Sequence, residues 1–430
     1  MPEAVIVGGV RTPFVKAGGP LNSVPTPDLG RMIVRELFER LNVDAQSVDE
    51  LIAGNVAPPS GAANPARVIA IRAGMAQGSI AHTVSRNCAS GMESITEAFD
   101  RVQSGKAKSV VALGVDSMSN IPVLWQKTLA EKFWNLSQAK GPFRKLAALA
   151  RIRPRDLAPE IGIKLGLTDP ISGLMMGDTA EKLAREYRIS REEQDAFALR
   201  SHQRAVAAWK ANRLADEVMT LYPEPDSTAI SQDIGPRDGQ SLEALAKLKP
   251  FFDRRWGTVT VGNSCQVTDG AVALLIMEKE LARSMSLEPL GTIRSYAYAG
   301  CDPARMGLGP VYSSSRALQA AKLRMSDMEL VELNEAFAAQ VLACQRAFAN
   351  PPADCAGGSP DHLSEIHDEI LNVNGGAIAL GHPVGASGAR LVLTLLNELG
   401  RSGKRLGLAT MCVGGGQGGA IIVERLGAAA

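Results

Sequence analysis

The hydrophobic and polar positions of the first 118 residues alternate as they do in a layered α/β protein. The runs "AVIVGGV", near the N-terminus, and "KSVVALGV", at residues 108–115, are short and mainly apolar, which is typical of strands buried in a sheet. The segments "DLGRMIVRELFERLN" and "GMESITEAFDRVQSG" space their apolar residues as helices do, and Gly105 is well placed to end the second one. This part of the chain is therefore predicted to form an α/β domain.

The same alternation returns from about residue 285, and it repeats the first region in outline. The segment "CASGMESITEAFDRVQSGKAKSVVALGV" aligns with "GASGARLVLTLLNELGRSGKRLGLATMCV", and "VDELIAGNV" matches "DMELVELNEAF". Both copies carry the turn A-S-G, at residues 89–91 and 386–388, followed by a helix and an apolar strand. The copies lie about 300 residues apart, so they indicate a duplicated domain and exclude a short solenoid repeat.

The region between the two copies is more polar and largely helical in pattern. Its clearest helix begins at "ISREEQ", where Ser190 is a good N-cap and Glu193 stands in capping-box position. Residues 121–156 combine four large aromatic side chains with eight Lys and Arg against two acids, a local net charge of +6. Such a stretch is either a surface for acidic partners or a solvated excursion of the chain, and the pattern leaves both open.

Composition narrows the class of protein. The chain has 430 residues, which suggests two to three domains, and its net charge of +1 gives no sign of nucleic-acid binding. The N-terminus lacks the features of a signal peptide, and no uncharged apolar run is long enough to span a membrane, so we expect a cytoplasmic protein. Six Cys without a CxxC pair and five scattered His indicate free thiols and no metal site.

Cys88 is the first candidate for chemistry. The thiol lies in "SRNCASGMESI" among small and polar residues, directly before a predicted helix, whereas structural Cys residues usually sit inside apolar runs. A helix N-terminus offers free N–H groups and a partial positive charge, which favour the reactive thiolate. The pattern favours a nucleophile over a structural Cys at a tight turn.

Three further motifs lie at predicted strand ends or helix starts, where active sites of α/β folds collect. They are "NEAFA" with Asn334, "GHPVGASGAR" with His382, and "MCVGGGQGG" with Cys412. Each of these residues alone is more often structural. The glycine run after Cys412 points toward chemistry, because its backbone N–H groups can approach a ligand closely and stabilise an oxyanion.

With "LKPFFDRRWGTVTVGNSCQVTDGA", these signatures in this order make the chain resemble the thiolase family over essentially its whole length. The resemblance implies an α/β thiolase fold, in which two duplicated halves form five αβαβα layers with an inserted, mainly helical loop domain. The expected boundaries are residues 1–118 plus 256–284 for the N-terminal half, 119–255 for the loop domain and 285–430 for the C-terminal half.

The resemblance also implies the role of each site residue. Cys88 would be the acylated nucleophile and His382 the group that activates it. Cys412 would be the acid/base at the α-carbon of acetyl-CoA, and Asn334 would hold a water that polarises its thioester carbonyl together with His382. The N–H groups of Cys88 and Gly414 would form a second oxyanion hole. The expected reaction is thiolysis of 3-ketoacyl-CoA to acetyl-CoA and a shortened acyl-CoA, reversible as a condensation, within fatty-acid β-oxidation.

The expected ligands are 3-ketoacyl-CoA, acyl-CoA and CoA, with CoA as co-substrate and no permanently bound cofactor. Met175, Met176 and Cys265 are expected CoA contacts, although short-chain biosynthetic members of the family often have His in place of Met175, and a Ser is common in place of Cys265. An insert at residues 350–370 resembles the branch containing the thiolase subunit of the β-oxidation complex. That branch implies a homodimer or larger assembly, a hydratase/dehydrogenase partner subunit, and peripheral membrane contact through residues 121–156.

Three alternatives remain. A biosynthetic acetoacetyl-CoA thiolase would carry the same motifs. A decarboxylating ketoacyl synthase of the same superfamily would lack the second catalytic Cys, so Cys412 argues against it. A non-catalytic acyl-CoA-binding or lipid-binding relative would have lost a catalytic residue, and none is lost here.

Overall fold

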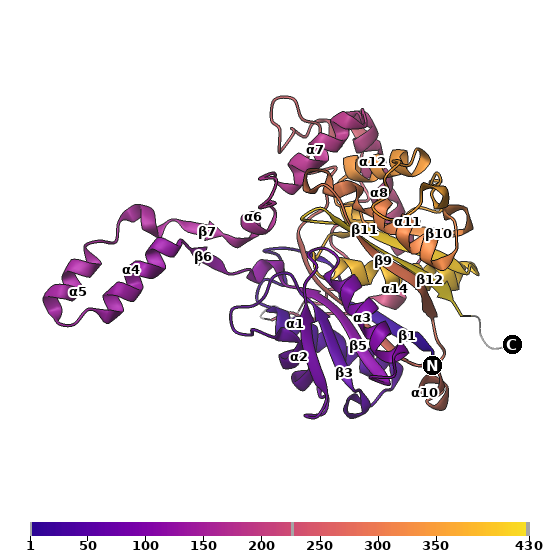
Figure 1. The fold of residues 1–430 in the computed structure, drawn as a ribbon, viewed down its shortest axis with the longest axis horizontal. Helices are drawn as coiled ribbons and strands as arrows, with labels where there is room; N and C mark the ends of the chain where they lie inside the picture. The colour runs from indigo at the N-terminus through magenta and orange to yellow at the C-terminus, as the bar shows by residue number, and fades with distance from the viewer. Residues whose placement is uncertain (1, 225–227, 427–430) are drawn as a thin grey trace. The chain divides into compact units, whose positions relative to one another are not determined.

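A computed structural model describes residues 2–224 and 228–426 (Figure 1). The chain divides into two compact units, and residues 121–168 form the smaller one. The larger unit, built from the chain on both sides of that segment, carries every residue for which the sequence predicts a catalytic role.

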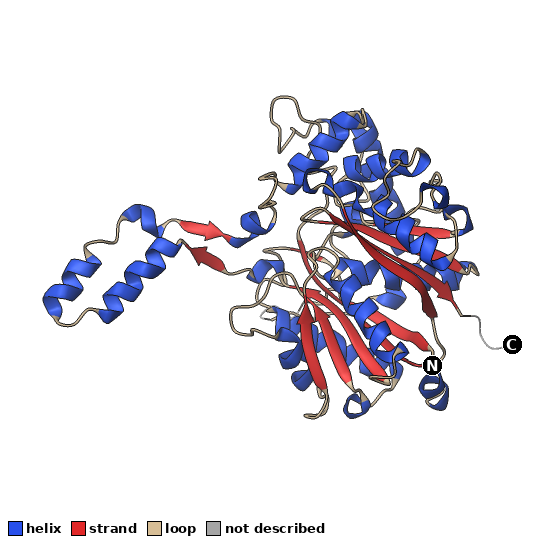
Figure 2. Cartoon of the chain, in the orientation of Figure 1, coloured by secondary structure: helices blue, strands red, loops and turns tan. Residues whose placement is uncertain are grey.

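The larger unit alternates strands and helices in both of its halves (Figure 2). Its strands are β1 (Ala4–Arg11), β2 (Val15–Lys16), β3 (Glu50–Gly54), β4 (Ile80–Val84), β5 (Ser109–Asp116), β8 (Thr268–Glu278), β9 (Gly291–Gly300), β10 (Leu330–Leu333), β11 (Leu406–Val413) and β12 (Gln417–Arg425). Its α-helices are α1 (Thr26–Leu41), α2 (Pro65–Ala73), α3 (Ser90–Gln103), α7 (Met176–Glu186), α8 (Arg191–Lys210), α9 (Leu242–Ala246), α10 (Lys279–Ser284), α11 (Gly309–Ala321), α12 (Ala338–Ala349), α13 (Ala377–Leu380) and α14 (Ser387–Ser402).

The strand order shows the duplication directly. The sheet runs β4-β3-β5-β8-β1 through the first half and β9-β12-β11-β10 through the second, joined where Ile6 of β1 pairs with Gly291 of β9. In the first half β3 is parallel to β4 and β5, whereas β8 is antiparallel to β5 and β1. The second half repeats these directions, with β10 parallel to β11 and β12 antiparallel to β11 and β9. The predicted duplication is confirmed.

Alternating side chains of each strand feed separate cores, which produces the layers. Val111 and Leu113 of β5 pack with α1 and α2 on one outer face, whereas Val110 and Ala112 face α3 and α14 in the middle layer. In the second half, Leu408 of β11 packs outward against α11 and α12. Helices therefore cover both outer faces and fill the space between the two half-sheets, as the five-layer prediction requires.

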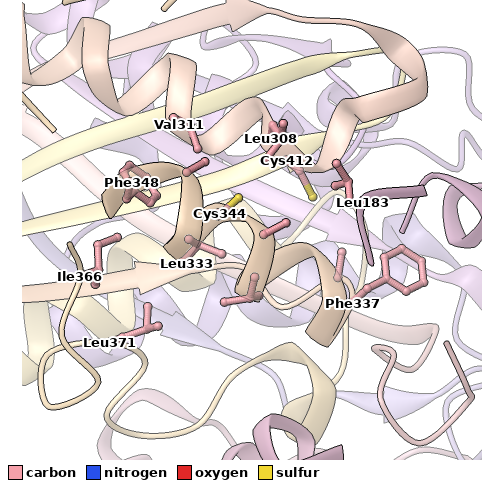
Figure 3. Packing of buried hydrophobic residues seen from close by; sticks show 14 of the residues in the cluster. Leu183, Leu308, Val311, Leu333, Phe337, Cys344, Phe348, Ile366, Leu371 and Cys412 are labelled. Carbon is pink, nitrogen blue, oxygen red and sulfur yellow. The ribbon is translucent and has the colours of Figure 1, made fainter. Parts of the chain in front are cut away.

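The outer core of the second half surrounds one of the candidate site residues. Cys412, on β11, lies among apolar side chains that include Leu183 of α7 and Cys344 of α12 (Figure 3). Its side chain points to the same side of β11 as that of Leu408, which precedes it by four residues.

The two A-S-G turns start the two central helices, and their glycines bring those helices together. A Cβ on Gly91 would stand 2.7 Å from the Gly385 carbonyl oxygen, and a Cβ on Gly388 would stand 2.8 Å from the Met92 backbone nitrogen. Both obstacles are backbone atoms, so they cannot turn aside as a flexible side chain could. The close approach of α3 and α14 therefore depends on glycine at these two positions.

The smaller unit is a helical hairpin on a short ribbon (Figure 2). Strands β6 (Val123–Trp125) and β7 (Pro159–Ile161) pair antiparallel, and α4 (Lys127–Gln138), α5 (Pro142–Leu149) and the short α6 (Gly162–Gly166) complete it. Its described side chains bury little apolar surface. Leu129 is 2% exposed, whereas Trp134 is 68% and Phe143 88% exposed. The segment thus displays large apolar side chains together with its excess of basic ones.

Candidate active site

Cys88 stands on a tight turn between β4 and α3. The preceding residue, Asn87, adopts a left-handed backbone with φ of 44°, a conformation that Asn tolerates better than most residues. The Asn87 side-chain amide donates to the Gly414 carbonyl oxygen at 2.8 Å. This bond joins the nucleophile turn of the first half to the glycine turn between β11 and β12 of the second half.

The electrostatics of Cys88 differ from the sequence expectation. Burial raises the pKa of its thiol above the ordinary value, and the N–H groups of Gly414 and of Cys88 itself oppose that effect. Burial is the larger effect, so the resting thiol is protonated at neutral pH. The same two N–H groups are those for which the resemblance to thiolases implies an oxyanion hole.

His382 is buried in the loop between α13 and α14. Its backbone N–H donates to the Gln266 carbonyl at 3.0 Å, and its ring Nδ1 lies 2.6 Å from Ser387 Oγ. Burial, followed by the nearby Arg390 cation, lowers the pKa of His382 to about 4. The imidazole is therefore neutral at pH 7 and has a nitrogen lone pair with which to accept a proton.

Asp116, which the sequence analysis did not single out, holds the His382 loop in place. Its carboxylate accepts from the N–H groups of Val56 and Ala57, both at 3.0 Å, and from Gly385 N–H at 2.5 Å. Burial raises its pKa to about 6 in spite of these donors. One acid at the end of β5 thereby ties a loop of the first half to the residues just before α14.

Cys412 and Cys265 lie near Cys88. Burial and then the Cys88 thiol raise the pKa of Cys412 well above its ordinary value, and the same two causes raise that of Cys265 to about 12. Cys412 is 1% exposed and stands one residue before the end of β11. Three protonated thiols therefore share this site, and Cys412 is suited to act as a proton donor as long as it stays protonated.

Asn334 supplies an uncommitted amide group. It directly follows β10 and is fully buried, and its backbone N–H donates to the Thr410 carbonyl at 3.0 Å. Neither side-chain amide atom has a hydrogen-bond partner among the described residues. Buried amides are nearly always paired, so this unpaired one indicates a place for a ligand or water.

The neighbour of Asn334, Glu335, is structural and was not anticipated. It accepts hydrogen bonds from the Ser201 hydroxyl at 2.6 Å, the Asn372 amide at 2.9 Å and the Ile378 N–H at 3.2 Å. The acid of the "NEAFA" motif thus fixes the glycine-rich loop that leads to His382. The position of this acid next to Asn334 is a weak signal of a role in the site, but the partners that define that role are distant in sequence.

The structure distinguishes the two methionines expected to contact CoA. The Met176 sulfur lies 3.5 Å from the point where a Cβ on Gly414 would stand, so it borders the glycine turn. Met175 caps the N-terminus of α7, where its N–H donates to Asp178 at 3.0 Å. Among the described contacts, only Met176 is placed at the turn that faces Cys88.

The described residues contain no group of three or more His, Cys, Asp or Glu side chains that could hold a metal ion. None of the helices in the described part of the chain is long and apolar enough to cross a membrane.

Comparison with known proteins identifies the family. Residues 4–280 match the model "Thiolase, N-terminal domain" and residues 287–425 match "Thiolase, C-terminal domain". The chain belongs to the thiolase family. It is 41% identical to a 3-ketoacyl-CoA thiolase of Yersinia enterocolitica over 97% of this chain and 96% of that protein.

Solved thiolase structures agree in fold. The human mitochondrial 3-ketoacyl-CoA thiolase in complex with CoA is 34% identical, with a TM-score of 0.86, and covers 99% of this chain and 98% of that one. The acetyl-CoA acetyltransferase of Bacillus anthracis is 35% identical, with a TM-score of 0.87, and covers 99% of both chains. This thiolase therefore has the expected fold and is an acyltransferase by family.

Proposed function

We propose that this thiolase cleaves 3-ketoacyl-CoA with CoA, giving acetyl-CoA and an acyl-CoA shortened by two carbons. The observation that carries the proposal is the meeting of the Cys88 thiol with the Gly414 N–H, beside Cys412. That arrangement provides a nucleophile, an oxyanion donor and a proton donor in one place. The named relatives, 3-ketoacyl-CoA thiolases of similar length, support the choice of substrate.

In the first half-reaction the Cys88 sulfur attacks the C3 ketone while neutral His382 takes the thiol proton. The oxygen of the tetrahedral intermediate is stabilised by the N–H groups of Cys88 and Gly414. The C2–C3 bond then breaks, leaving an acyl-Cys88 thioester and the enolate of acetyl-CoA. Cys412 protonates the enolate carbon, and a water held by Asn334, together with His382, stabilises the enolate oxygen.

In the second half-reaction the CoA thiol attacks the acyl-Cys88 thioester. The Cys412 thiolate left by the first half-reaction takes the CoA thiol proton as the CoA sulfur attacks, and the tetrahedral oxyanion uses the same two backbone N–H groups. Its collapse releases the shortened acyl-CoA and the Cys88 thiolate, which recovers its proton from His382. Run in reverse, the steps amount to a condensation in which Cys412 removes the α-proton. Because the two half-reactions together restore every proton on the enzyme, CoA is a co-substrate and no permanent cofactor is required.

The CoA chain is proposed to pass Met176 and Cys265 on its way to Cys88, with Met175 farther out. Met176 borders Gly414, and Cys265 lies close enough to Cys88 for the two thiols to interact electrostatically. Thioether and thiol side chains present soft, adaptable surfaces that suit a thin, flexible ligand.

The test is acylation of the Cys88→Ser variant. A hydroxyl is a far weaker nucleophile at neutral pH, so we expect no acyl-enzyme in the mass spectrum and no thiolysis, with an unchanged circular dichroism spectrum. Undiminished thiolysis by this variant would overturn the assignment.

Chain length separates the two enzyme alternatives. Measuring CoA-dependent thiolysis across 3-ketoacyl-CoA substrates of four to sixteen carbons, as a range of probes, distinguishes a degradative enzyme from an acetoacetyl-CoA thiolase. The similarity to an acetyl-CoA acetyltransferase keeps the second alternative open. Activity confined to the four-carbon substrate would favour it.

We also propose that the enzyme is at least a homodimer and that residues 121–156 dock it to an acidic surface, either an anionic membrane or a hydratase/dehydrogenase partner subunit. The exposed Trp134 and Phe143 in a stretch of local net charge +6 support this proposal. Replacing both residues with Ser should weaken co-sedimentation with phosphatidylglycerol vesicles. Unchanged co-sedimentation would remove the membrane alternative and leave the partner subunit.

A further inference from the structure

The duplicated turns place a serine at the same position of both central helices. Ser90 is the first residue of α3 and Ser387 the first residue of α14, and each is the middle residue of an A-S-G turn. Both side chains are fully buried. Cys88 precedes Ser90 by two residues, and His382 precedes Ser387 by five, so each serine is close in sequence to one reacting group.

Ser90 braces the turn that carries Cys88. Its hydroxyl oxygen accepts the Arg86 N–H at 2.8 Å, and its O–H donates to the Asn87 carbonyl at 2.7 Å. The direction of the first bond is certain, because a backbone N–H is always a donor. These two bonds close the turn around Asn87, whose left-handed backbone persists only where the surroundings hold it.

Ser387 makes the corresponding pair of contacts around His382. Its O–H donates to the Pro383 carbonyl at 3.1 Å, and its oxygen lies 2.6 Å from His382 Nδ1. A hydroxyl has one hydrogen, so when it is given to Pro383 the oxygen must accept from Nδ1–H. Ser90 has the same polarity: it donates to a carbonyl of the loop and accepts from an N–H.

A proton on Nδ1 decides which nitrogen can act as a base. Neutral imidazole carries one hydrogen, so Nδ1–H leaves Nε2 with a free lone pair. The low pKa of His382 keeps the ring neutral, in agreement with this assignment. The opposite tautomer would carry its hydrogen on Nε2, which would then have no lone pair with which to take the Cys88 proton.

We propose that Ser90 and Ser387 are a matched pair of positioning residues, of which Ser90 fixes the turn of the nucleophile and Ser387 fixes His382 as the Nδ1–H tautomer. The proposal rests on the proposed function only for the roles of Cys88 and His382. Neither serine touches the reacting atoms, so each acts through its neighbour.

Ser94 provides a matched control. It is also fully buried on α3, and its hydroxyl donates to the Gly91 carbonyl at 2.9 Å, a bond that serines in helices commonly make. Ser94→Ala therefore removes a buried hydroxyl of the same helix without touching the turn of Cys88 or the ring of His382.

The first experiment reads the tautomer without using the reaction. The whole enzyme, labelled with ¹⁵N-histidine, contains five His, and comparison with His382→Gln assigns the His382 signal. We expect a protonated Nδ1 and an unprotonated Nε2 in the resting enzyme and in Ser94→Ala. In Ser387→Ala we expect a mixture of tautomers. An Nε2–H tautomer in the native enzyme, or an unchanged signal in Ser387→Ala, overturns the proposal for Ser387.

The second experiment measures kinetics. We expect Ser387→Ala and Ser90→Ala each to lower the acylation rate by about 10-fold to 100-fold, within the range attributed to general acid–base catalysis, with KM little changed. Ser387→Thr keeps the hydroxyl and should recover most of the rate. If Ser90→Ala or Ser387→Ala acylates as fast as Ser94→Ala, that serine is structural only. An inactive native enzyme would instead refute the proposed function, while the tautomer result would still stand.

Discussion

At the scale of single residues, the site is neutral before substrate arrives. Burial raises the pKa of Cys88 and lowers that of His382 to about 4, so the thiol and the imidazole are both neutral at pH 7 and do not form an ion pair. A pre-formed thiolate–imidazolium pair would require the opposite shifts. In the proposed mechanism, proton transfer from Cys88 to His382 must therefore accompany attack on the ketone, which also limits side reactions of a free thiolate.

The pH dependence of Cys88 alkylation follows from this protonation state. Only the thiolate reacts with iodoacetamide, and its fraction grows tenfold per pH unit below the thiol pKa. We expect the alkylation rate, followed by mass spectrometry of the Cys88 peptide, to rise continuously from pH 6 to pH 9. A rate that is already flat at pH 7 would mean a pre-formed ion pair and would contradict the shifts.

Asn334 should affect rate without affecting stability much. Neither of its amide atoms is paired within the described structure, so Asn334→Ala forfeits no protein hydrogen bond from that side chain. If its amide positions a water for the enolate, kcat should fall by about 100-fold to 1,000-fold, the usual cost of losing one oxyanion donor. Steady-state thiolysis and thermal denaturation measure the two effects.

Asn372 is the matched control for that experiment. Its amide accepts the Leu333 N–H at 2.8 Å and donates to the Leu333 carbonyl at 2.8 Å and to Glu335 at 2.9 Å. Asn372→Ala should therefore lower the melting temperature clearly. Equal loss of stability in the two variants would show that Asn334 is structural as well.

At the scale of elements, the approach of α3 to α14 is the contact on which the site depends. Gly91→Ala would place a Cβ 2.7 Å from the Gly385 carbonyl oxygen, on the loop that carries His382. We expect a loss of about 1–3 kcal/mol in the free energy of unfolding, as for other overpacked sites, and a fall in kcat. Urea denaturation and thiolysis assays measure both.

Gly400 gives the control on the same pair of helices. It lies within α14, is exposed, and has open space where a Cβ would stand. Gly400→Ala should stabilise the protein by up to about 1 kcal/mol, because alanine is the better helix former. If Gly91→Ala were as stable as Gly400→Ala, the two helices would not be in close contact.

Secondary structure and duplication were predictable because both are local patterns. The apolar spacing of α1, α3 and α14, the capping box at Ser190 and the repeated A-S-G turn are all visible along the chain, and the structure has each of them. Asp116 and Glu335 were not predictable. Their partners come from several distant loops, so their importance appears only when the chain is folded.

The pKa shift of Cys88 could not be predicted from the sequence for a related reason. The position of Cys88 before a helix can be read from the sequence, but the N–H groups that lower its pKa are its own and that of Gly414, which is distant in sequence. Burial is a property of the whole fold, and it reverses the direction of the net pKa shift. The smaller unit gives a second example of what the sequence does not reveal. Its basic and aromatic composition is visible in the sequence, whereas the pairing of β6 with β7 was not predicted.

At the scale of the whole molecule, buried ionisable groups oppose one another in their response to pH. His202 and His382 have pKa values lowered to about 4, so they contribute stability that is lost as pH falls below 6.5. Burial raises the pKa of Asp116 to about 6 and that of Glu332 to about 7, so these two contribute stability that is lost as pH rises. Because the two effects have opposite signs, the stability of the native protein changes less between pH 4 and pH 7 than it would with any one of these groups alone.

Replacing one of these groups should therefore make the free energy of unfolding depend on pH more steeply than it does in the native protein. His202 lies outside the site, on α8, where its Nδ1 accepts the Arg237 N–H at 3.3 Å, and burial lowers its pKa. Gln can accept the same bond without titrating. As pH falls from 7.5 to 4, the free energy of unfolding of His202→Gln should rise by about 3 kcal/mol relative to that of the native protein, which is the free-energy equivalent of the His202 pKa shift. Over the same range, the free energy of unfolding of Asp116→Asn should fall relative to that of the native protein. Urea midpoints at several pH values measure both trends, and parallel curves for the three proteins would show that neither group is perturbed by burial.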